Sequence, residues 1–146
     1  MRIPKCDVFW ERELDEEESW RLMATIVGHW ILRGYGFWVV EHKTTRAFLG
    51  RVGLWNPLGW PGLEIGWAIS REYWRQGFAK ESALAVMNYA FGVMNVPKLI
   101  SVIAPSNEAS KRLAESLGMS LDRMHADEDG EMCIYKIERS TFWRAV

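Results

Sequence analysis

The residues best suited to chemistry lie where an apolar strand is expected to end and a helix to begin. This stretch reads Ile69-Ser-Arg-Glu-Tyr-Trp-Arg-Gln-Gly77-Phe-Ala-Lys80. The first backbone N–H groups of a helix have no partner within it, and the helix dipole adds positive potential, so such a turn can bind phosphate oxygens. Gly77 has no Cβ to obstruct a ligand. The residues alone leave two interpretations open, a phosphate-binding turn and an ordinary tight turn.

The helices and strands that would position this turn follow from the spacing of apolar residues. A helix is predicted over 15–33, with Asp15 as its cap and Gly34 at its end. The other predicted elements are strands Phe37–Glu41, Phe48–Trp55 and Leu63–Ser70, a helix over 78–94, strand Leu99–Ala104, a helix from Asn107 to Gly118, and a hairpin of Ser120–His125 and Met132–Ile137. This order predicts a mixed α/β fold, with helices packed on a single sheet.

Length and composition indicate one globular domain over residues 1–146. Hydrophobic residues make up 49% and charged residues 25% of the chain, which argues against disorder. The formal net charge of −1 gives no reason to expect a nucleic acid or an anionic membrane as partner. The N-terminus has no apolar run suited to a signal peptide, and no stretch approaches the roughly 18 apolar residues of a membrane helix. A soluble cytoplasmic protein is therefore the default expectation.

No metal site is expected. The cysteines Cys6 and Cys133 are too few and too far apart for a zinc site, and two free thiols are expected. The histidines His29, His42 and His125 have no metal-ligand spacing and are interpreted as structural or exposed. The nine tryptophans are more unusual, and they suggest a site or an interface with flat, amphipathic walls.

Two segments of the chain carry a family resemblance. Residues Glu64–Ser82 read EIGWAISREYWRQGFAKES, and residues Ser106–Met119 read SNEASKRLAESLGM. In order and spacing they resemble motifs of the GNAT superfamily of acyl-CoA-dependent N-acetyltransferases, and most closely the branch of the ribosomal-protein N-terminal acetyltransferases. The resemblance covers roughly residues 35–138. It implies a central, mostly antiparallel sheet flanked by helices, acetyl-CoA as co-substrate, and acetyl transfer to a primary amine of a protein N-terminus or a small molecule.

The resemblance also implies which residues hold acetyl-CoA. The backbone around three residues at the end of the strand would pair with the pantetheine arm: Ala68, Ile69 and Ser70. Five successive backbone N–H groups would hold the pyrophosphate: Arg75, Gln76, Gly77, Phe78 and Ala79. Asn107 would form hydrogen bonds with the pantetheine amides, and Ser110 would lie near the thioester sulfur.

Attack of an amine on a thioester needs groups that accept and donate protons. Glu64 is the candidate general base, directly or through water, because it lies in an otherwise apolar strand where loss of water would raise the carboxyl pKa. The alternative for Glu64 is a solvated carboxylate or an ion pair with Arg51 across the sheet. A backbone N–H near Ile69 would stabilise the oxyanion. Ser110 could protonate the leaving thiolate or only cap or pack its helix, and Asn107 could be only an N-cap.

The acceptor side is defined less sharply. Trp55 and Trp60, in or beside a Pro- and Gly-containing loop, are predicted together with Tyr35 to line the acceptor pocket, where a cation–π contact with an ammonium group is available. Two features depart from the family pattern. Trp74 stands where many members carry Arg or Gln. The strand and helix that normally precede the helix over 15–33 are missing or shortened, so the acceptor site would be more open or completed by a partner subunit, and a homodimer is favoured.

Two other functions stay open on the sequence. A non-catalytic module that binds or senses CoA would keep the turn at Gly77 and lose the acceptor side. A protein- or glycan-interaction domain would use the tryptophan-rich surface, and its strand–helix turn would have no ligand. Binding of acetyl-CoA separates this last function from the other two, and release of free CoA in the presence of an amine separates the enzyme from the sensor.

Overall fold

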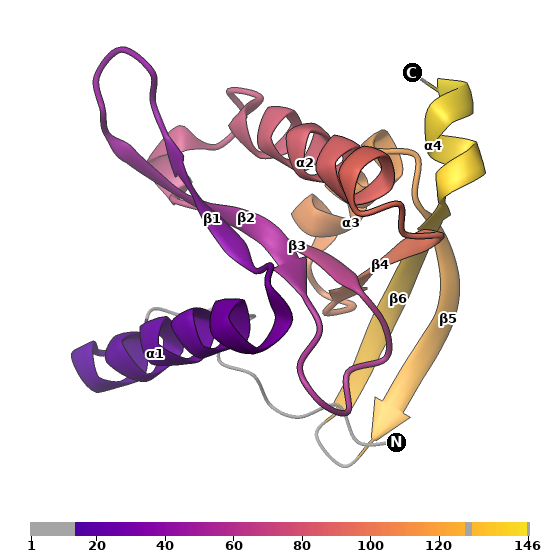
Figure 1. The fold of residues 1–146 in the computed structure, drawn as a ribbon, viewed down its shortest axis with the longest axis horizontal. Coiled ribbons are helices and arrows are strands. Elements are labelled where there is room, and N and C mark those ends of the chain that lie inside the picture. Colours follow the sequence, from indigo (N-terminus) through magenta and orange to yellow (C-terminus); the bar gives the residue numbers. More distant parts are fainter. Residues whose placement is uncertain (1–13, 128–129, 146) are drawn as a thin grey trace.

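A computed structural model describes residues 14–127 and 130–145 (Figure 1). The elements along the chain are α1 (Glu16–Arg33), β1 (Phe37–Glu41), β2 (Phe48–Trp55), β3 (Glu64–Ile69), α2 (Phe78–Asn88), β4 (Lys98–Ile103), α3 (Glu108–Ser116), β5 (Ser120–Asp127), β6 (Gly130–Glu138) and α4 (Arg139–Ala145). A 3-10 turn, Arg71–Tyr73, lies between β3 and α2, and a π-helical turn, Tyr89–Val93, extends α2. The predicted succession of helices and strands is confirmed up to β6.

Six strands form one sheet in the order β1-β2-β3-β4-β6-β5. Strands β3 and β4 run parallel, and the other neighbouring pairs are antiparallel. The expectation of a mixed α/β fold with a mostly antiparallel sheet is therefore confirmed. Within the described residues, β1 and β5 form the two edges of this sheet.

The first helix begins and ends where its sequence predicts. Glu18 N–H donates a hydrogen bond of 2.8 Å to the Asp15 carboxylate, and Asp15 N–H donates one of 3.0 Å to the Glu18 carboxylate, which together form a capping box. Gly34 ends α1 in the left-handed conformation, with φ of 74°. The inner side of the helix buries Leu22 and His29 against the sheet.

Two apolar clusters cover the two faces of the sheet. Successive residues of a strand point to opposite faces, and in β2 Leu54 belongs to one cluster while Trp55 belongs to the other. The larger cluster packs against α2 through Met87 and against α4 through Phe142, and α3 joins it on the same face. The smaller cluster packs against α1 through Leu22. Figure 1 shows α1 lying apart from α2 accordingly. The two helices that carry the predicted site residues, α2 and α3, thus share one face.

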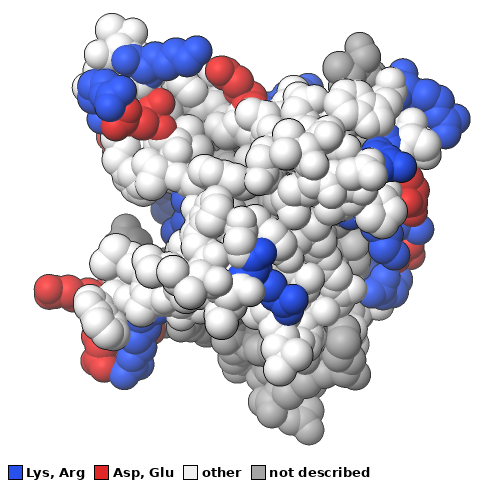
Figure 2. Space-filling view, in the orientation of Figure 1, with Lys and Arg blue, Asp and Glu red and all other residues white. Residues whose placement is uncertain are grey.

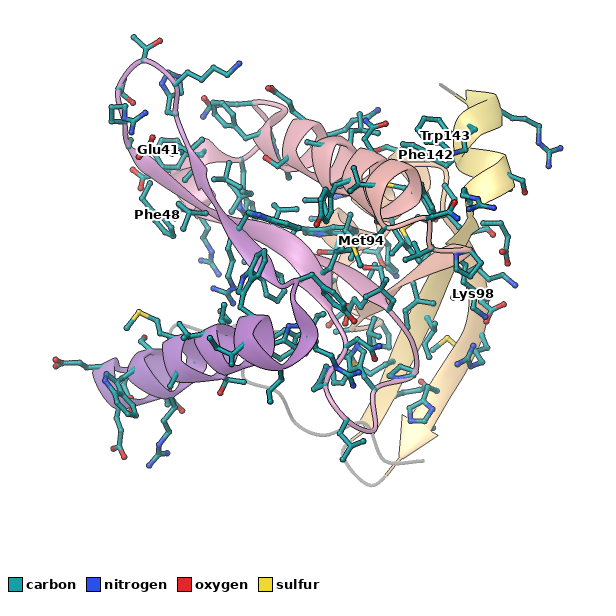
Figure 3. All side chains as sticks on the ribbon, in the orientation of Figure 1. Glu41, Phe48, Met94, Lys98, Phe142 and Trp143 are labelled. Carbon is teal, nitrogen blue, oxygen red and sulfur yellow. The ribbon has the colours of Figure 1, made fainter. Side chains whose placement is uncertain are left out.

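Two segments differ from the predictions. The helix predicted over 78–94 is α-helical only as far as Asn88 and then widens into the π-helical turn. No element is predicted after Ile137, yet the chain forms α4, which carries Phe142 and Trp143 (Figure 3). The Phe142 ring packs against Phe91, with ring centroids 5.0 Å apart. A seven-residue helix is too short to show a periodic pattern, and its stability comes from such tertiary packing.

Candidate functional site

The two parallel strands at the centre of the sheet separate soon after they meet. Their single register pair places Glu64 opposite Ile100. Beyond it, side chains replace the backbone ladder. Ser101 Oγ donates a hydrogen bond of 3.0 Å to the Ile65 carbonyl oxygen, and Val102 N–H donates one of 2.9 Å to Glu64 Oε1. No further register pair joins these two described strands, so their backbones are not paired towards the end of β3. This unpaired stretch is the β3–β4 gap.

Backbone groups of Ile69 face this gap. Ser70 N–H donates to the Leu49 carbonyl oxygen at 2.9 Å. Because hydrogen bonding alternates along an antiparallel pair, Ala68 also bonds towards β2 while Ile69 points the other way. The Ile69 carbonyl oxygen accepts a hydrogen bond of 2.6 Å from Trp74 Nε1. Of the three residues expected to meet a pantetheine arm, Ile69 is therefore the one whose backbone faces the gap, whereas the Ser70 N–H is taken by β2.

The turn before α2 has the open geometry that its sequence predicts. Gly77 is the N-cap residue, in the left-handed conformation with φ of 86°, and no side chain caps the helix. Arg75, two residues earlier, also has a positive φ, 60°. The intrahelical ladder begins with Glu81 N–H donating to the Gly77 carbonyl oxygen, so Phe78 and the two residues after it have no intrahelical acceptor. A Cβ placed on Gly77 would meet nothing within 4 Å. Such a concave run of amides fits a diphosphate group.

Two predicted residues lie at the start of α3. Asn107 is its N-cap, and the Asn107 Oδ1 accepts a hydrogen bond of 3.0 Å from Ser110 N–H. The Ser110 Oγ accepts one of 3.2 Å from Trp67 Nε1, which ties α3 to β3. A serine hydroxyl that accepts one hydrogen bond can still donate its own hydrogen. The capping interpretation of Asn107 is therefore confirmed, and Ser110 does more than pack its helix.

The Glu64 carboxyl is fully buried at the start of β3, where β3 and β4 are still paired. In addition to the bond from Val102, its Oε2 accepts a hydrogen bond of 2.6 Å from Trp60 Nε1. Burial raises the pKa of Glu64 to about 8, although both hydrogen bonds act in the opposite direction. The expectation that desolvation raises this pKa is confirmed, and the alternative of a solvated carboxylate is wrong. The register places Arg51 opposite Ala68, four residues along β3 from Glu64, so the sheet does not bring this pair together.

Two of the three aromatic residues expected to line the acceptor pocket, Tyr35 and Trp55, pack against His29. Trp55 has no exposed surface, and its ring stacks on His29 with centroids 4.4 Å apart. His29 Nε2 accepts a hydrogen bond from Asn56 N–H, which leaves Nδ1 to donate to the Tyr35 carbonyl oxygen. Burial lowers the pKa of His29, in keeping with this neutral form. Trp60 is 8% exposed and Tyr35 is half-buried. Because Trp55 has no exposed surface, it is packed inside the protein and does not line an open pocket.

Two contacts of the site have no counterpart in the sequence interpretation: the bond from Trp67 to Ser110 and the bond from Trp74 to Ile69. For Trp67 a signal was available, because the N–H of a partly buried tryptophan usually finds an acceptor. The sequence could not identify the acceptor, because Trp67 and Ser110 are 43 residues apart in the chain. No cluster of three metal-ligating side chains occurs in the described part of the chain, nor does any helix there have the length and apolarity to cross a membrane.

Comparison with known families decides the classification. The family model described as acetyltransferase (GNAT) domain matches residues 1–120.

The chain belongs to the GNAT acetyltransferase family.

Individual proteins agree with this membership. The uncharacterized protein YkkB of Bacillus subtilis (strain 168) is 32% identical over 108 residues, which cover 71% of this chain and 63% of YkkB. The crystal structure of an acetyltransferase from Agrobacterium tumefaciens superposes with a TM-score of 0.78 at 27% identity, covering 86% of this chain and 73% of that one. A ribosomal-protein-S5-alanine acetyltransferase from Vibrio fischeri has a TM-score of 0.72 at 16% identity, covering 92% and 81% of the two chains, and shows the shared fold. This GNAT chain thus spans less than two thirds of YkkB.

Proposed function

We propose that this GNAT chain is an acetyl-CoA-dependent N-acetyltransferase, which transfers the acetyl group to a primary amine by direct attack on the thioester. The observation that carries the proposal is that the β3–β4 gap and the open first turn of α2 lie at the two ends of one short connection, from Ile69 to Gly77. A long carrier with a diphosphate needs both features. The turn supplies unpaired amides for the phosphates, and the gap supplies free backbone groups for an arm that contains amides.

Each residue of the site has a role in this proposal. The diphosphate is bound by the backbone N–H groups of Arg75, Gln76, Gly77, Phe78 and Ala79. The arm lies along the end of β3, near Ala68, Ile69 and Ser70, with Asn107 as a side-chain partner. When bound, acetyl-CoA supplies an acetyl group activated as a thioester. The free Ile69 N–H is the donor that we assign to the oxyanion, because it faces the gap.

Proton transfer falls to Glu64 and Ser110. The pKa of about 8 makes Glu64 a base of suitable strength near neutral pH. Since its side chain is fully buried, a proton from the acceptor amine reaches it through water. Ser110 donates its hydroxyl hydrogen to the departing thiolate and is reprotonated, through water, by the proton that Glu64 took from the amine. The Trp67 N–H holds the hydroxyl oxygen in place.

The acceptor is a primary amine of a protein N-terminus or a small molecule. Of the predicted acceptor residues, Tyr35 is half-buried and has surface to offer the acceptor, whereas Trp60 is only 8% exposed. We propose a homodimer as the working form, supported by the outward face of α1, where Trp20, Val27 and Ile31 are 66%, 61% and 80% exposed. A cytoplasmic location follows from the proposed use of acetyl-CoA.

Binding of acetyl-CoA tests the cofactor part of the proposal. At a hundredfold excess over the dissociation constant, a ligand that binds only the folded state stabilises it by roughly 3 kcal/mol. We expect acetyl-CoA to raise the melting temperature accordingly. Pantetheine, which lacks the diphosphate, should have a much smaller effect. No shift with acetyl-CoA would contradict both the enzyme and the CoA sensor, and would favour the interaction domain.

Release of free CoA tests the catalytic part. A panel of peptides with free N-termini and of small amines is incubated with acetyl-CoA, and the liberated thiol is followed with a chromogenic disulfide. Amine-dependent release supports the transferase. Binding without release by any amine of the panel would instead assign this GNAT chain to the non-catalytic CoA modules.

A further inference from the structure

A short connection joins the β3–β4 gap to the turn over residues 75–79, the diphosphate turn. Its backbone hydrogen bonds are local. Tyr73 N–H donates to the Ser70 carbonyl oxygen at 2.9 Å, and Trp74 N–H donates to the Arg71 carbonyl oxygen at 3.1 Å. Both bonds close the 3-10 turn between β3 and α2, and neither reaches back to β3. Contact between the connection and the strand comes from a side chain.

Two side chains of the connection bond to backbone groups earlier in the chain. Gln76 Nε2 donates a hydrogen bond of 3.1 Å to the Glu72 carbonyl oxygen, which joins the diphosphate turn to the 3-10 turn. Trp74 Nε1 donates one of 2.6 Å to the carbonyl oxygen of Ile69, the last residue of β3. The Gln76 bond therefore holds the two turns together, and the Trp74 bond holds both of them against the strand.

Trp74 owes its position to this bond more than to burial. The side chain is 51% exposed, and the Arg71 guanidinium lies over its ring at 5.9 Å from the centroid. A ring left half in water gains only part of the stabilisation that full burial provides. Its N–H is directed at Ile69, the residue whose backbone faces the gap. The indole thus bridges the two parts of the proposed cofactor site.

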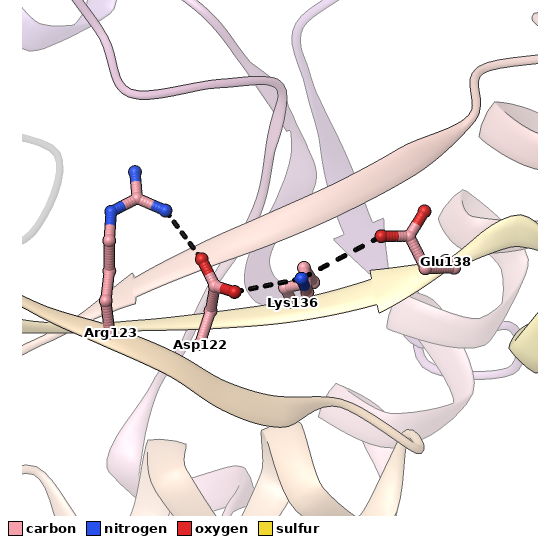
Figure 4. Close-up of polar contacts among 4 residues, drawn as sticks. All are labelled: Asp122, Arg123, Lys136 and Glu138. Carbon is pink, nitrogen blue, oxygen red and sulfur yellow. Dashed lines mark hydrogen bonds and ion pairs between the residues drawn. The ribbon is translucent and has the colours of Figure 1, made fainter.

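The polar contacts at the β5 edge of the sheet are of a different kind. There Asp122 forms ion pairs with Arg123 at 2.6 Å and with Lys136 at 2.9 Å (Figure 4). Charged side chains also gather on this side of the molecule in Figure 2. These pairs lie on β5 and β6, which a backbone ladder already joins, and exposed ion pairs contribute little to stability. The Trp74 bond instead joins β3 to the end of a 3-10 turn, which takes no part in the ladder.

We propose that Trp74 is a positioning residue for acetyl-CoA: its indole N–H fixes the connection against the end of β3 and so sets the separation between the β3–β4 gap and the diphosphate turn. This inference rests on the proposed function, in which one acetyl-CoA molecule occupies both places. The pantetheine arm and the diphosphate are then two linked ligands, and linked ligands gain affinity only where their two sites match the span of the linker.

The bond from Trp74 does not exclude the arm from Ile69. A backbone carbonyl oxygen has two lone pairs, so the Ile69 oxygen that accepts from the indole can also accept from an amide of the arm. The Ile69 N–H, which we assign to the oxyanion, is not involved in the bond to Trp74. Trp74 therefore acts through the position of the backbone, and it does not take the place of the ligand.

Calorimetric titration with acetyl-CoA compares two variants of Trp74. Trp74→Phe removes the N–H and keeps an aromatic face for Arg71. Trp74→Gln restores an N–H donor that is separated from Cα by the same number of bonds. We expect Trp74→Phe to bind acetyl-CoA about tenfold more weakly, and Trp74→Gln to stay within about threefold of the wild type. Trp143→Phe, at a 47% exposed position of α4, is the matched control and should bind like the wild type. Equal melting temperatures show that the variants fold.

The two halves of acetyl-CoA distinguish positioning from a structural role. ADP carries a diphosphate without the arm, and pantetheine carries the arm without the diphosphate. Each fragment occupies only one of the two places, so wild type and Trp74→Phe should bind each fragment equally in ligand-observed NMR titrations. Weaker binding of ADP by Trp74→Phe would overturn the positioning role, because Trp74 would then support the shape of the diphosphate turn itself.

The remaining outcomes separate this inference from the proposed function. Equal affinity of wild type and Trp74→Phe for acetyl-CoA would overturn the inference and leave the cofactor site in place. Tighter binding by Trp74→Phe would also overturn it, since the indole would then compete with the arm for the Ile69 carbonyl oxygen. Binding by Trp74→Gln as weak as that by Trp74→Phe would show that the N–H is not the group that matters. No binding by the folded wild type would overturn the proposed function, and this inference with it.

Discussion

Two neighbouring parts of the site are built in opposite ways. The first turn of α2 presents backbone amides around the open Gly77, and it depends on conformation more than on the side chains around it. At the start of β3, Glu64 is a side chain with no exposed surface, and its two oxygens accept hydrogen bonds from Trp60 and Val102. The first arrangement resists most substitutions but not the loss of a glycine. The second depends on one carboxyl, whose loss affects both the sheet and the proposed chemistry.

The largest effect is expected from Glu64→Ala. It removes the carboxylate oxygens that accept from the buried N–H groups of Trp60 and Val102, and it creates a cavity, for a loss of about 3–5 kcal/mol in the free energy of unfolding. Urea denaturation monitored by tryptophan fluorescence measures this loss. Glu131→Ala, at an exposed position of β6, is the control and should change the free energy by less than about 0.5 kcal/mol. If Glu64→Ala lost no more stability than Glu131→Ala, the Glu64 carboxyl would not hold the two strands together.

Of the two arrangements, the one built on Glu64 should make the stability of the chain depend on pH. The pKa of Glu64 is about 8 in the folded chain and near 4.5 in the unfolded one. Between these values the folded state holds a proton that the unfolded state has lost, so this contribution to stability is complete below about pH 4.5 and is lost as the pH rises to about 8, on the order of a few kcal/mol. Unfolding free energies across this range, compared for wild type and Glu64→Gln, measure it. Equal slopes for the two proteins would contradict the raised pKa.

Trp60→Phe tests how the Trp60 hydrogen bond affects the pKa of Glu64. It removes one of the two hydrogen bonds that lower the Glu64 pKa, so the pKa should rise further and the loss of stability should extend to higher pH. The midpoint of the change, from the same pH series, is the measurement. A shift to lower pH would mean that the Trp60 bond does not act on the ionised form.

The turn is tested with Gly77→Val. We expect affinity for acetyl-CoA to fall by about a hundredfold, because the new side chain occupies the open space and the positive φ disfavours any residue with a Cβ. Gly34→Val is the matched control, since Gly34 has a similar φ, 74°, and equally open space, but lies at the end of α1. Calorimetric titration of both variants gives the answer. Equal affinities in the two would refute the phosphate-binding turn.

The smallest effect concerns Ser110. Ser110→Ala removes the proposed proton donor and leaves the Trp67 N–H without its acceptor, so turnover should fall about tenfold while stability falls by about 1 kcal/mol. Ser116→Ala on the same helix loses only a bond to the Leu113 carbonyl oxygen and should keep full turnover. Unchanged turnover in Ser110→Ala would remove the hydroxyl from the mechanism and leave it a structural role.

The parts of the site that the sequence predicts are local. The cap at Asp15, the stop at Gly34 and the turn at Gly77 each depend on a few adjacent residues, and the structure confirms their positions. Asn107 caps α3 for the same reason. Predictions about contacts between residues far apart in the chain were less accurate. Trp55 was assigned to an acceptor pocket and is buried under His29, because the pleat of β2 and its pairing decide which face a ring occupies.

By itself, the sequence determined the order of helices and strands as far as β6, the glycine at the start of α2 and the family, because caps, turns and hydrophobic periods act between residues close in the chain. Only the tertiary structure decided how far β3 and β4 stay together, that Glu64 is completely buried, and that its partners are Trp60 and the amide of Val102, 38 residues away. Desolvation and long-range hydrogen bonds depend on what packs around a group, and no local pattern specifies that.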